Sequence, residues 1–326
     1  MITYVATAHH TYTMEDYLRT WGRSLAATIR VLSYDDLFSG EEVGAGTFIF
    51  SDLERLSAAG SRAAARVWSE LEAADAPVRL LNAPARVLRR QALLERLHEA
   101  GLNRFRSYRL TETQTPERFP VFLRDANEHE HFTPLLGTQE EVDRALAGLC
   151  SDGRCLDELL MVEFCDVSDS AGLYRKYSAF WVADRLIPRH LIFSRSWVLK
   201  EPDLIDDDKL REEWDYLETN PHCDELRRVF ELANVDYGRI DYGVKDGCIQ
   251  AWEINTNPIV MLRPERYHPA HLPVQEPFAA QIEAAFRAVD TDDGGRSIPV
   301  TIDADLRAQL ARERELLREW SESQAP

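Results

Sequence analysis

The sequence predicts an α/β (α+β) fold, with a parallel sheet near the N-terminus and antiparallel strand pairs further along the chain. Short apolar runs alternate with helical segments over residues 1–81, as in βαβ units. Two later segments, 174–193 and 237–255, each have the pattern of two strands around a tight turn. The chain has 326 residues, which is long for a single core, so two or three lobes are expected.

Residues 1–81 are expected to form a first domain of alternating strands and helices. The expected elements are, in order, a strand at 2–6, a helix at 14–28, strands at 29–32 and 47–50, a helix at 56–73 and a strand at 78–81. Strands separated by helices imply parallel pairing. No G-x-G-x-x-G motif follows the first strand, so dinucleotide binding by this domain has no support.

Residues 82–298 form the expected central region, and 299–326 a charged C-terminal helix. Asn82-Ala-Pro84 interrupts the pattern before a helix at 85–100, which Gly101 closes. The later expected elements are a strand at 120–124, a helix at 139–149, strands at 159–166, 174–183 and 186–193, surface helix and loop at 201–225, a helix at 226–233, the strand pair at 239–255 and a helix at 303–323.

The composition excludes several classes of protein. With 38 Lys and Arg against 56 Asp and Glu, the net charge is −18, which argues against nonspecific binding of nucleic acid. The five cysteines show no C-x-x-C spacing, as expected for free thiols in a reducing compartment. The N-terminus has no signal-peptide pattern, and no run of eighteen apolar residues occurs. We therefore expect a soluble, cytoplasmic protein.

The most informative stretch, residues 237–258, has the pattern of a β-hairpin. In a hairpin, strand residues of one parity share a face. Asp241, Glu253 and Asn255 can therefore converge on one side, with Arg239 beside Asp241. One acidic residue alone is usually a solvated strand residue. Two carboxylates and an amide oxygen together form the all-oxygen set that Mg²⁺ takes alongside substrate phosphates, so this face is a candidate metal site.

The R-x-D at 239–241 and the E-x-N at 253–255, which runs into Asn257-Pro258, resemble the metal-binding hairpin of the ATP-grasp superfamily. The resemblance implies an ATP-grasp fold with an N-terminal βα pre-domain, a lid lobe at about 116–162 and a C-terminal lobe that carries the hairpin. It also implies ATP and Mg²⁺ as cofactors, with Mn²⁺ as a substitute. The metal ligands that it implies are Asp241, Glu253 and Asn255.

In that family two lysines meet the nucleotide phosphates, and this chain has arginine at both matching positions. One lysine lies on a helix about eleven residues before a glycine, where this chain has Arg90 before Gly101, with Arg89 as an alternative. The other ends a strand that follows a proline, where this chain has Arg124. Arginine keeps the charge but presents a planar fork rather than a point charge. The resemblance thus implies phosphate binding by Arg90 and Arg124.

The lid departs from the family pattern. Family members usually have a glycine-rich loop whose N–H groups cover the phosphates. The matching stretch here, 125–134, contains no glycine. His129 and His131 are candidate donors in its place, or simply exposed residues.

The end of the strand at 159–166 resembles the hinge that contacts adenine in the family. The resemblance implies that the backbone of Glu163, Phe164 and Cys165 binds the adenine edge. A nearby carboxylate holds the ribose in the family, and Asp166 and Asp169 are both candidates.

A further phosphate-binding cation is expected at 174–177. Lys176 is preferred, although strand alternation alone does not exclude Arg175. His190 is a candidate substrate-side group, with a structural role as the alternative.

The resemblance implies an ATP-dependent ligase that activates a carboxylate as an acyl phosphate and couples it to an amine. Arg239 is the candidate for stabilising the oxyanion of the second step. The alternatives are a small-molecule kinase and a nucleotide-binding module without catalysis. The expected partners are small-molecule or peptide carboxylates and amines, with no nucleic acid and no membrane. The sequence leaves the oligomeric state open, a dimer included.

Overall fold

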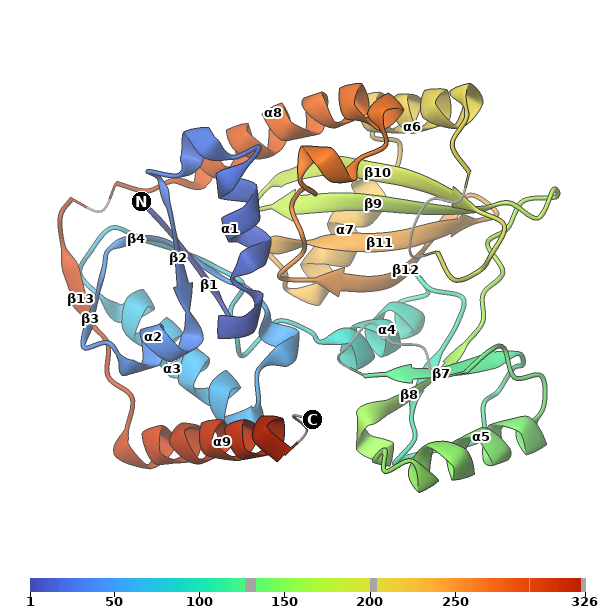
Figure 1. The fold of residues 1–326 in the computed structure, drawn as a ribbon, viewed down its shortest axis with the longest axis horizontal. Coiled ribbons are helices and arrows are strands. Elements are labelled where there is room, and N and C mark those ends of the chain that lie inside the picture. Colours follow the sequence, from blue (N-terminus) through green and yellow to red (C-terminus); the bar gives the residue numbers. More distant parts are fainter. Residues whose placement is uncertain (127–132, 200–203, 293, 324–326) are drawn as a thin grey trace. The chain divides into compact units, whose positions relative to one another are not determined.

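The computed structural model describes residues 1–126, 133–199, 204–292 and 294–323, and it confirms the α/β class (Figure 1). The chain forms two compact units. Unit 1 consists of residues 1–87, 234–238 and 256–326, and unit 2 of residues 88–233 and 239–255. The expected boundary at residue 81 lies near the end of the first segment of unit 1. The expected three-part division of the chain stays a prediction.

Unit 1 is built on a four-stranded parallel sheet, and all four of its strands were predicted. The strands are β1 (Ile2–Ala6), β2 (Ile29–Ser33), β4 (Gly46–Phe50) and β5 (Val78–Leu81). Their order is β2-β1-β4-β5, and each neighbouring pair is parallel. A separate two-stranded sheet pairs β3 (Glu42–Gly44) with β13 (Ser297–Pro299), neither of which was predicted.

Five α-helices of the described residues belong to unit 1. They are α1 (Tyr12–Arg19), α2 (Tyr34–Ser39), α3 (Ala58–Ala73), α8 (Leu272–Val289) and α9 (Ala304–Ser323). Helices α2 and α8 were not predicted from the sequence. The helix expected at 14–28 ends instead at Arg19, because Gly22 packs against the ring of Tyr17. A Cβ at Gly22 would lie 2.4 Å from Cε1 of that ring, so the chain turns there with a residue that has none.

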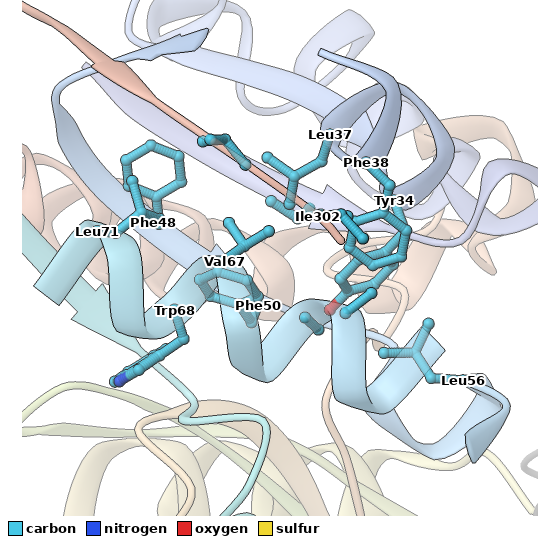
Figure 2. Close-up of a cluster of buried hydrophobic side chains, with 14 of the residues drawn as sticks. Tyr34, Leu37, Phe38, Phe48, Phe50, Leu56, Val67, Trp68, Leu71 and Ile302 are labelled. Atoms are coloured by element: carbon cyan, nitrogen blue, oxygen red, sulfur yellow. The ribbon is translucent and has the colours of Figure 1, made fainter. Parts of the chain in front are cut away.

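The two faces of the parallel sheet bury different side chains. Val5, Phe48 and Phe50 lie in one hydrophobic core with apolar side chains of α2, α3 and α9. Figure 2 shows Phe48 and Phe50 among residues of α2 and α3. Tyr4 alternates with Val5 and packs instead against Tyr237, with ring centroids 5.6 Å apart. Tyr237 in turn packs against Phe286 of α8, with ring centroids 5.9 Å apart, so helices lie on both faces of the sheet.

Unit 2 contains a small antiparallel sheet at the expected lid lobe. Its order is β6-β8-β7, from β6 (Ser107–Arg109), β8 (Leu159–Glu163) and β7 (Val121–Asp125). Helix α5 (Gln139–Ser151) packs on this sheet through Val142 and Leu146. The strand expected at 159–166 ends earlier, at Glu163.

The second sheet of unit 2 has the order β10-β9-β11-β12. Its strands are β9 (Tyr174–Val182), β10 (Arg185–Ser194), β11 (Tyr237–Lys245) and β12 (Cys248–Asn255). Helices α6 (Asp207–Thr219) and α7 (Cys223–Ala233) pack against it. Both strand pairs and their turns were predicted.

Helix α4 (Arg90–Glu99) begins five residues later than the sequence predicted. The preceding residues form a turn, in which the N–H groups of Arg86 and Val87 donate to the carbonyl of Ala83. Gly101 follows the helix at φ +70°, as expected for its left-handed closing residue. The late start makes Arg90 the first helical residue.

None of the helices in the described ranges combines the length and the apolarity that crossing a bilayer needs.

One buried asparagine joins three segments of unit 1. Asn82 follows β5 at φ +66°, and its amide nitrogen donates to the carbonyls of Phe50 and Tyr237 at 3.1 and 2.8 Å. Its amide oxygen accepts from the N–H groups of Asp236 and Tyr237 at 2.8 and 2.9 Å. The side chain therefore fixes the end of β5 to β4 and to the start of β11.

We expect Asn82→Ala to lower the free energy of unfolding by about 3 kcal/mol, because it leaves several buried backbone groups without a partner. Urea unfolding measures the change. Asn82→Gly is the control, since it removes the same bonds but suits the left-handed backbone, and it should cost about 1 kcal/mol less. Wild-type stability in the alanine variant contradicts this role.

Candidate functional site

The hairpin of β11 and β12 has the register that the sequence pattern requires. Asp241 lies directly opposite Glu253, and Arg239 lies opposite Asn255. A bulge follows Asp241, so that Tyr242 pairs with Ala251. Since paired residues and those two positions apart share a face, the four polar side chains stand on one side of the sheet.

Asp241 is almost completely buried and is held by three neighbours. Nε of Arg239 donates to its Oδ1 at 3.1 Å, and the Ser178 hydroxyl donates to the same atom at 2.9 Å. Nζ of Lys176 lies 3.4 Å from Oδ2. Burial alone raises the pKa of such a carboxyl, but Arg239 and Lys176 outweigh it and hold the pKa at about 2. Asp241 is therefore an anion at neutral pH.

Glu253 is held by two arginines from other parts of unit 2. Nη2 of Arg90, at the start of α4, donates to its Oε2 at 2.6 Å. Nη2 of Arg124, on β7, lies 3.5 Å from the same oxygen. Arg90 is fixed further, because its Nη1 donates to the carbonyls of Asp125 and Ala126. The two arginines suggested by the resemblance thus meet at one carboxylate.

Burial and the nearby Arg90 lower the pKa of Arg124 to about 10. Arg124 remains a cation at neutral pH, with a side chain that is 8% exposed. A cation that is shielded from water interacts strongly with a nearby anion.

The six side chains form what we call the cation cluster. It consists of Arg90, Arg124, Lys176, Arg239, Asp241 and Glu253. Among the described residues, four cations lie against the carboxylates of Asp241 and Glu253, and Asp125 is a further negative charge near Arg124, within a chain whose net charge is −18. Side-chain exposures of 8–18% limit screening by water. The cluster is therefore suited to binding an anion.

The donor set fits a hard divalent cation only in part. Within the described ranges, no group of three or more His, Cys, Asp and Glu side chains is arranged to hold a metal ion. The two carboxylates with the Asn255 amide are an all-oxygen set of three. Mg²⁺ is typically bound by one or two carboxylates plus substrate phosphates and water, so this set is compatible with it.

Adjacent basic residues of β9 point in opposite directions. Lys176 meets Asp241, as does Ser178 two positions along, whereas Arg175 pairs with Asp169 at 2.7 Å and with Glu212 at 2.5 Å. The choice of Lys176 over Arg175 thus agrees with the geometry. Sequence reasoning missed Ser178, although its spacing from Lys176 placed it on the same face.

The Glu163 side chain connects the ends of β8 and β6 to the loop that precedes β7. Its carboxylate accepts from the Tyr108 hydroxyl at 2.7 Å, from the Arg106 N–H at 3.1 Å and from Nη2 of Arg118 at 2.7 Å. The N–H of Glu163 donates to the Arg106 carbonyl. The N–H of Phe164 donates to the Pro120 carbonyl.

The backbone N–H groups of Glu163 and Phe164, two of the three expected hinge residues, are therefore already hydrogen-bonded within unit 2. Cys165 is partly buried, and its thiol lies 3.8 Å from Oε1 of Gln250. Burial raises the pKa of that thiol. Adenine recognition at this hinge stays a prediction.

Asp166 and Asp169, the two candidates for binding ribose, have different hydrogen-bond partners. Asp169 accepts from the N–H groups of Ala171 and Leu173, and its pairing with Arg175 lowers its pKa to about 2. Asp166 accepts from the N–H of Ser168 at 3.0 Å. Both carboxylates therefore stabilise their own loop, Asp169 also forms an ion pair, and a ribose-binding role for either stays a prediction.

His190 lies on β10, and burial lowers its pKa well below the usual value, with Arg189 adding to the effect. Its Nε2 has no hydrogen-bond partner among the residues that the structure describes. The alternative lid donors His129 and His131 lie outside the described residues.

No protein-family model matches the chain, and a comparison with curated proteins gives no match. Solved structures do match. A RimK domain protein of ATP-grasp type from Sphaerobacter thermophilus has 12% identity, a TM-score of 0.49 and coverage of 88% of this chain and 100% of that one. A D-alanine–D-alanine ligase from Bacillus anthracis, complexed with ATP, has 12% identity, a TM-score of 0.44 and coverage of 87% and 98%.

A third match is the ATP-grasp ligase PsnB in complex with Mg and ADP, with 14% identity, a TM-score of 0.48 and coverage of 86% and 96%. These three proteins are similar to the chain in overall structure. Similarity at this level concerns the fold. The function is argued from the residues of this chain.

The structural role of the buried Glu163 carboxylate can be tested by substitution. We expect Glu163→Gln to lower the free energy of unfolding by about 2 kcal/mol, the scale for hydrogen bonds to a charged group. Glu117→Gln is the matched control, because that carboxylate pairs with Arg106 but is 62% exposed, and its loss should cost under about 0.5 kcal/mol. Equal effects of the two variants in thermal unfolding contradict the structural role.

Proposed function

We propose that this protein is an ATP-grasp enzyme that activates a carboxylate with ATP and couples it to an amine. The observation that carries the proposal is the cation cluster, in which four cations and two carboxylates meet on one face of a sheet. An anion with several charges, such as a nucleotide triphosphate, suits the excess positive charge.

Each cation of the cluster has a role in this proposal. Arg90, Arg124 and Lys176 bind phosphate oxygens, for which guanidinium and ammonium groups are the usual donors. Glu253 must then exchange its arginine partners for a divalent cation. The exchange keeps Glu253 compensated, because a divalent cation carries the same charge as the two guanidinium groups that it replaces.

Asp241, Glu253 and Asn255 are the residues proposed to hold Mg²⁺, with Mn²⁺ as a substitute. The metal supplies charge neutralisation at the phosphates. In phosphoryl transfer the protein contributes mainly positioning and electrostatic stabilisation, and fixed cations can provide both. The substrate carboxylate attacks the γ-phosphorus, and ADP leaves with the bridging oxygen.

Arg239 is proposed to act in the second step. An amine attacks the carbonyl carbon of the acyl phosphate, and the developing negative charge on the carbonyl oxygen needs a donor. Arg239 is already positioned on the same face by its bond to Asp241. Collapse of the tetrahedral species expels inorganic phosphate and leaves an amide.

The proposed substrates are small-molecule or peptide carboxylates and amines. A location in the cytoplasm is part of the proposal, supported by five cysteines that are all free thiols.

The reaction is tested by trapping the acyl group. The wild type, with ATP, Mg²⁺, hydroxylamine and a pool of the proteinogenic amino acids or short peptides, should form an acyl hydroxamate and release ADP. Glu253→Gln should abolish both while its circular dichroism spectrum stays unchanged, and Glu265→Gln, an exposed acid of unit 1, is the control. A phosphorylated product without hydroxamate contradicts the ligase and supports a kinase.

The phosphate role of the cluster is tested by two neighbours on β9. Lys176→Ala should weaken binding of ADP with Mg²⁺ by about 10- to 100-fold, the equivalent of one charged hydrogen bond. Arg175→Ala should leave affinity unchanged, because Arg175 faces Asp169 and Glu212. Isothermal titration calorimetry measures both. An equal loss in the two variants contradicts the assignment.

A further inference from the structure

A chain of hydrogen-bonded aromatic side chains lies behind the candidate site, within unit 2. Tyr216 of α6 donates its hydroxyl proton to the Ser178 carbonyl at 2.8 Å. The hydroxyl oxygens of Tyr216 and Tyr242 lie 3.2 Å apart, and Nδ1 of His222 lies 3.0 Å from the Tyr242 oxygen. We call Tyr216, Tyr242 and His222 the tyrosine relay. Its three members belong to the same unit as Ser178 and Asp241.

The relay lies on the face of the sheet opposite to the candidate site. Successive residues of a strand point to opposite faces. Asp241 and Lys176 point to the candidate site, and Tyr242 and Tyr177 directly follow them on β11 and β9. The two tyrosine rings stack on each other, with centroids 5.4 Å apart. The ring of His222 packs edge-on against both of them.

The hydrogen bonds of the relay run in one direction. Each tyrosine hydroxyl has a single proton, and the Ser178 carbonyl can only accept, so the Tyr216 proton is engaged there. Tyr242 must then donate to the Tyr216 oxygen, and Nδ1 of His222 must donate to the Tyr242 oxygen. Burial lowers the pKa of His222, so its ring is neutral at neutral pH. The neutral imidazole therefore carries its proton on Nδ1.

The relay bonds the sheet at two places where the strand pairing is irregular. Between β11 and β12, the register shifts between Asp241 and Tyr242. Between β10 and β9, it shifts between Pro188 and His190, and His190 lies opposite Ser178. Such bulges disrupt the ladder locally and occur next to active sites, where they change the direction of a side chain. The relay thus adds side-chain bonds where the ladder alone fixes the backbone least.

Ser178 connects the relay to Asp241 through the sheet. Its carbonyl accepts from Tyr216, and its hydroxyl donates to Oδ1 of Asp241 at 2.9 Å and to the Ile240 carbonyl at 3.2 Å. Mg²⁺ needs near-ideal octahedral geometry, so the direction of each ligand matters. Loss of a group that orients a metal ligand typically lowers metal affinity by about 10- to 100-fold.

We propose that Tyr216, Tyr242 and His222 are positioning residues that act through Ser178 to direct the Asp241 carboxylate toward a divalent cation. The inference rests on the proposed metal role of Asp241 and adds three residues that touch neither the metal nor a substrate. Packing depends on the aromatic rings, whereas positioning depends on the hydroxyl groups. Substitution of tyrosine by phenylalanine therefore separates the two roles.

The test is Mn²⁺ binding in the presence of ADP, with free Mn²⁺ measured by electron paramagnetic resonance. Tyr216→Phe should raise the dissociation constant of Mn²⁺ about 10-fold. Tyr177→Phe is the matched control and should leave it unchanged. The Tyr177 ring lies 5.1 Å from that of Tyr216, but its hydroxyl takes no part in the three relay bonds.

A double variant shows whether Tyr216 acts through Ser178. Tyr216→Phe added to Ser178→Ala should weaken Mn²⁺ binding no further than Ser178→Ala alone, since the bond to Asp241 is already lost. If Tyr216→Phe does not fold by circular dichroism, Tyr242→Phe takes its place. That variant keeps the bond from Tyr216 to Ser178 and should also weaken Mn²⁺ binding.

Equal Mn²⁺ affinity in Tyr216→Phe and Tyr177→Phe, or additive losses in the double variant, overturn the inference while the metal role stands. A wild type that binds no Mn²⁺ with ADP overturns the metal role and this inference with it. The relay is also read without metal, by ¹⁵N NMR of labelled histidine. His222 should carry its proton on Nδ1, and Tyr242→Phe, which removes the acceptor, should lower that share. A wild-type His222 with its proton on Nε2 overturns the inference.

Discussion

The candidate site depends on the compensation of two buried carboxylates by four cations. Asp241 and Glu253 face each other across one strand pair, so each repels the other at close range. Two such groups remain ionised in a dry environment only if cations lie against them. Arg90, from α4, and Arg124, from β7, supply this compensation at Glu253. The pairing joins three elements of unit 2 at one place.

The same pairing explains how a strongly acidic chain can offer a site for phosphate. Net charge governs solubility and long-range behaviour, whereas binding depends on charges within a few ångströms. Within the described part of the chain, the cation cluster holds more cations than carboxylates, and its side chains have limited exposure. Replacement of lysine by arginine at two family positions fits this arrangement, since one guanidinium, that of Arg90, bonds Glu253 and two carbonyl oxygens at once.

The sequence predicted those parts of the fold and of the candidate site that depend on the spacing of apolar and polar residues along a single strand or helix. The strands of unit 1 and the hairpin followed from alternation and turn residues, and alternation brought Asp241 and Glu253 to one face. It could not assign Lys176 and Arg175 to their faces, because the sequence does not state which face of β9 is covered. It also missed Ser178, whose hydroxyl bonds Asp241 between two strands that are distant in sequence. The start of α4 was misplaced because a turn after Ala83 replaces its first expected helical turn.

The central claim is that the cation cluster binds phosphate and metal together. A crystal structure with ADP and Mn²⁺, in which anomalous scattering locates the metal, tests it most directly. We expect a Mn²⁺ peak among Asp241, Glu253 and Asn255. We also expect phosphate oxygens within about 3 Å of Arg90, Arg124 or Lys176, the distance of a charged hydrogen bond. A nucleotide bound elsewhere, with the Arg90–Glu253 pair intact and no metal at the hairpin, contradicts it.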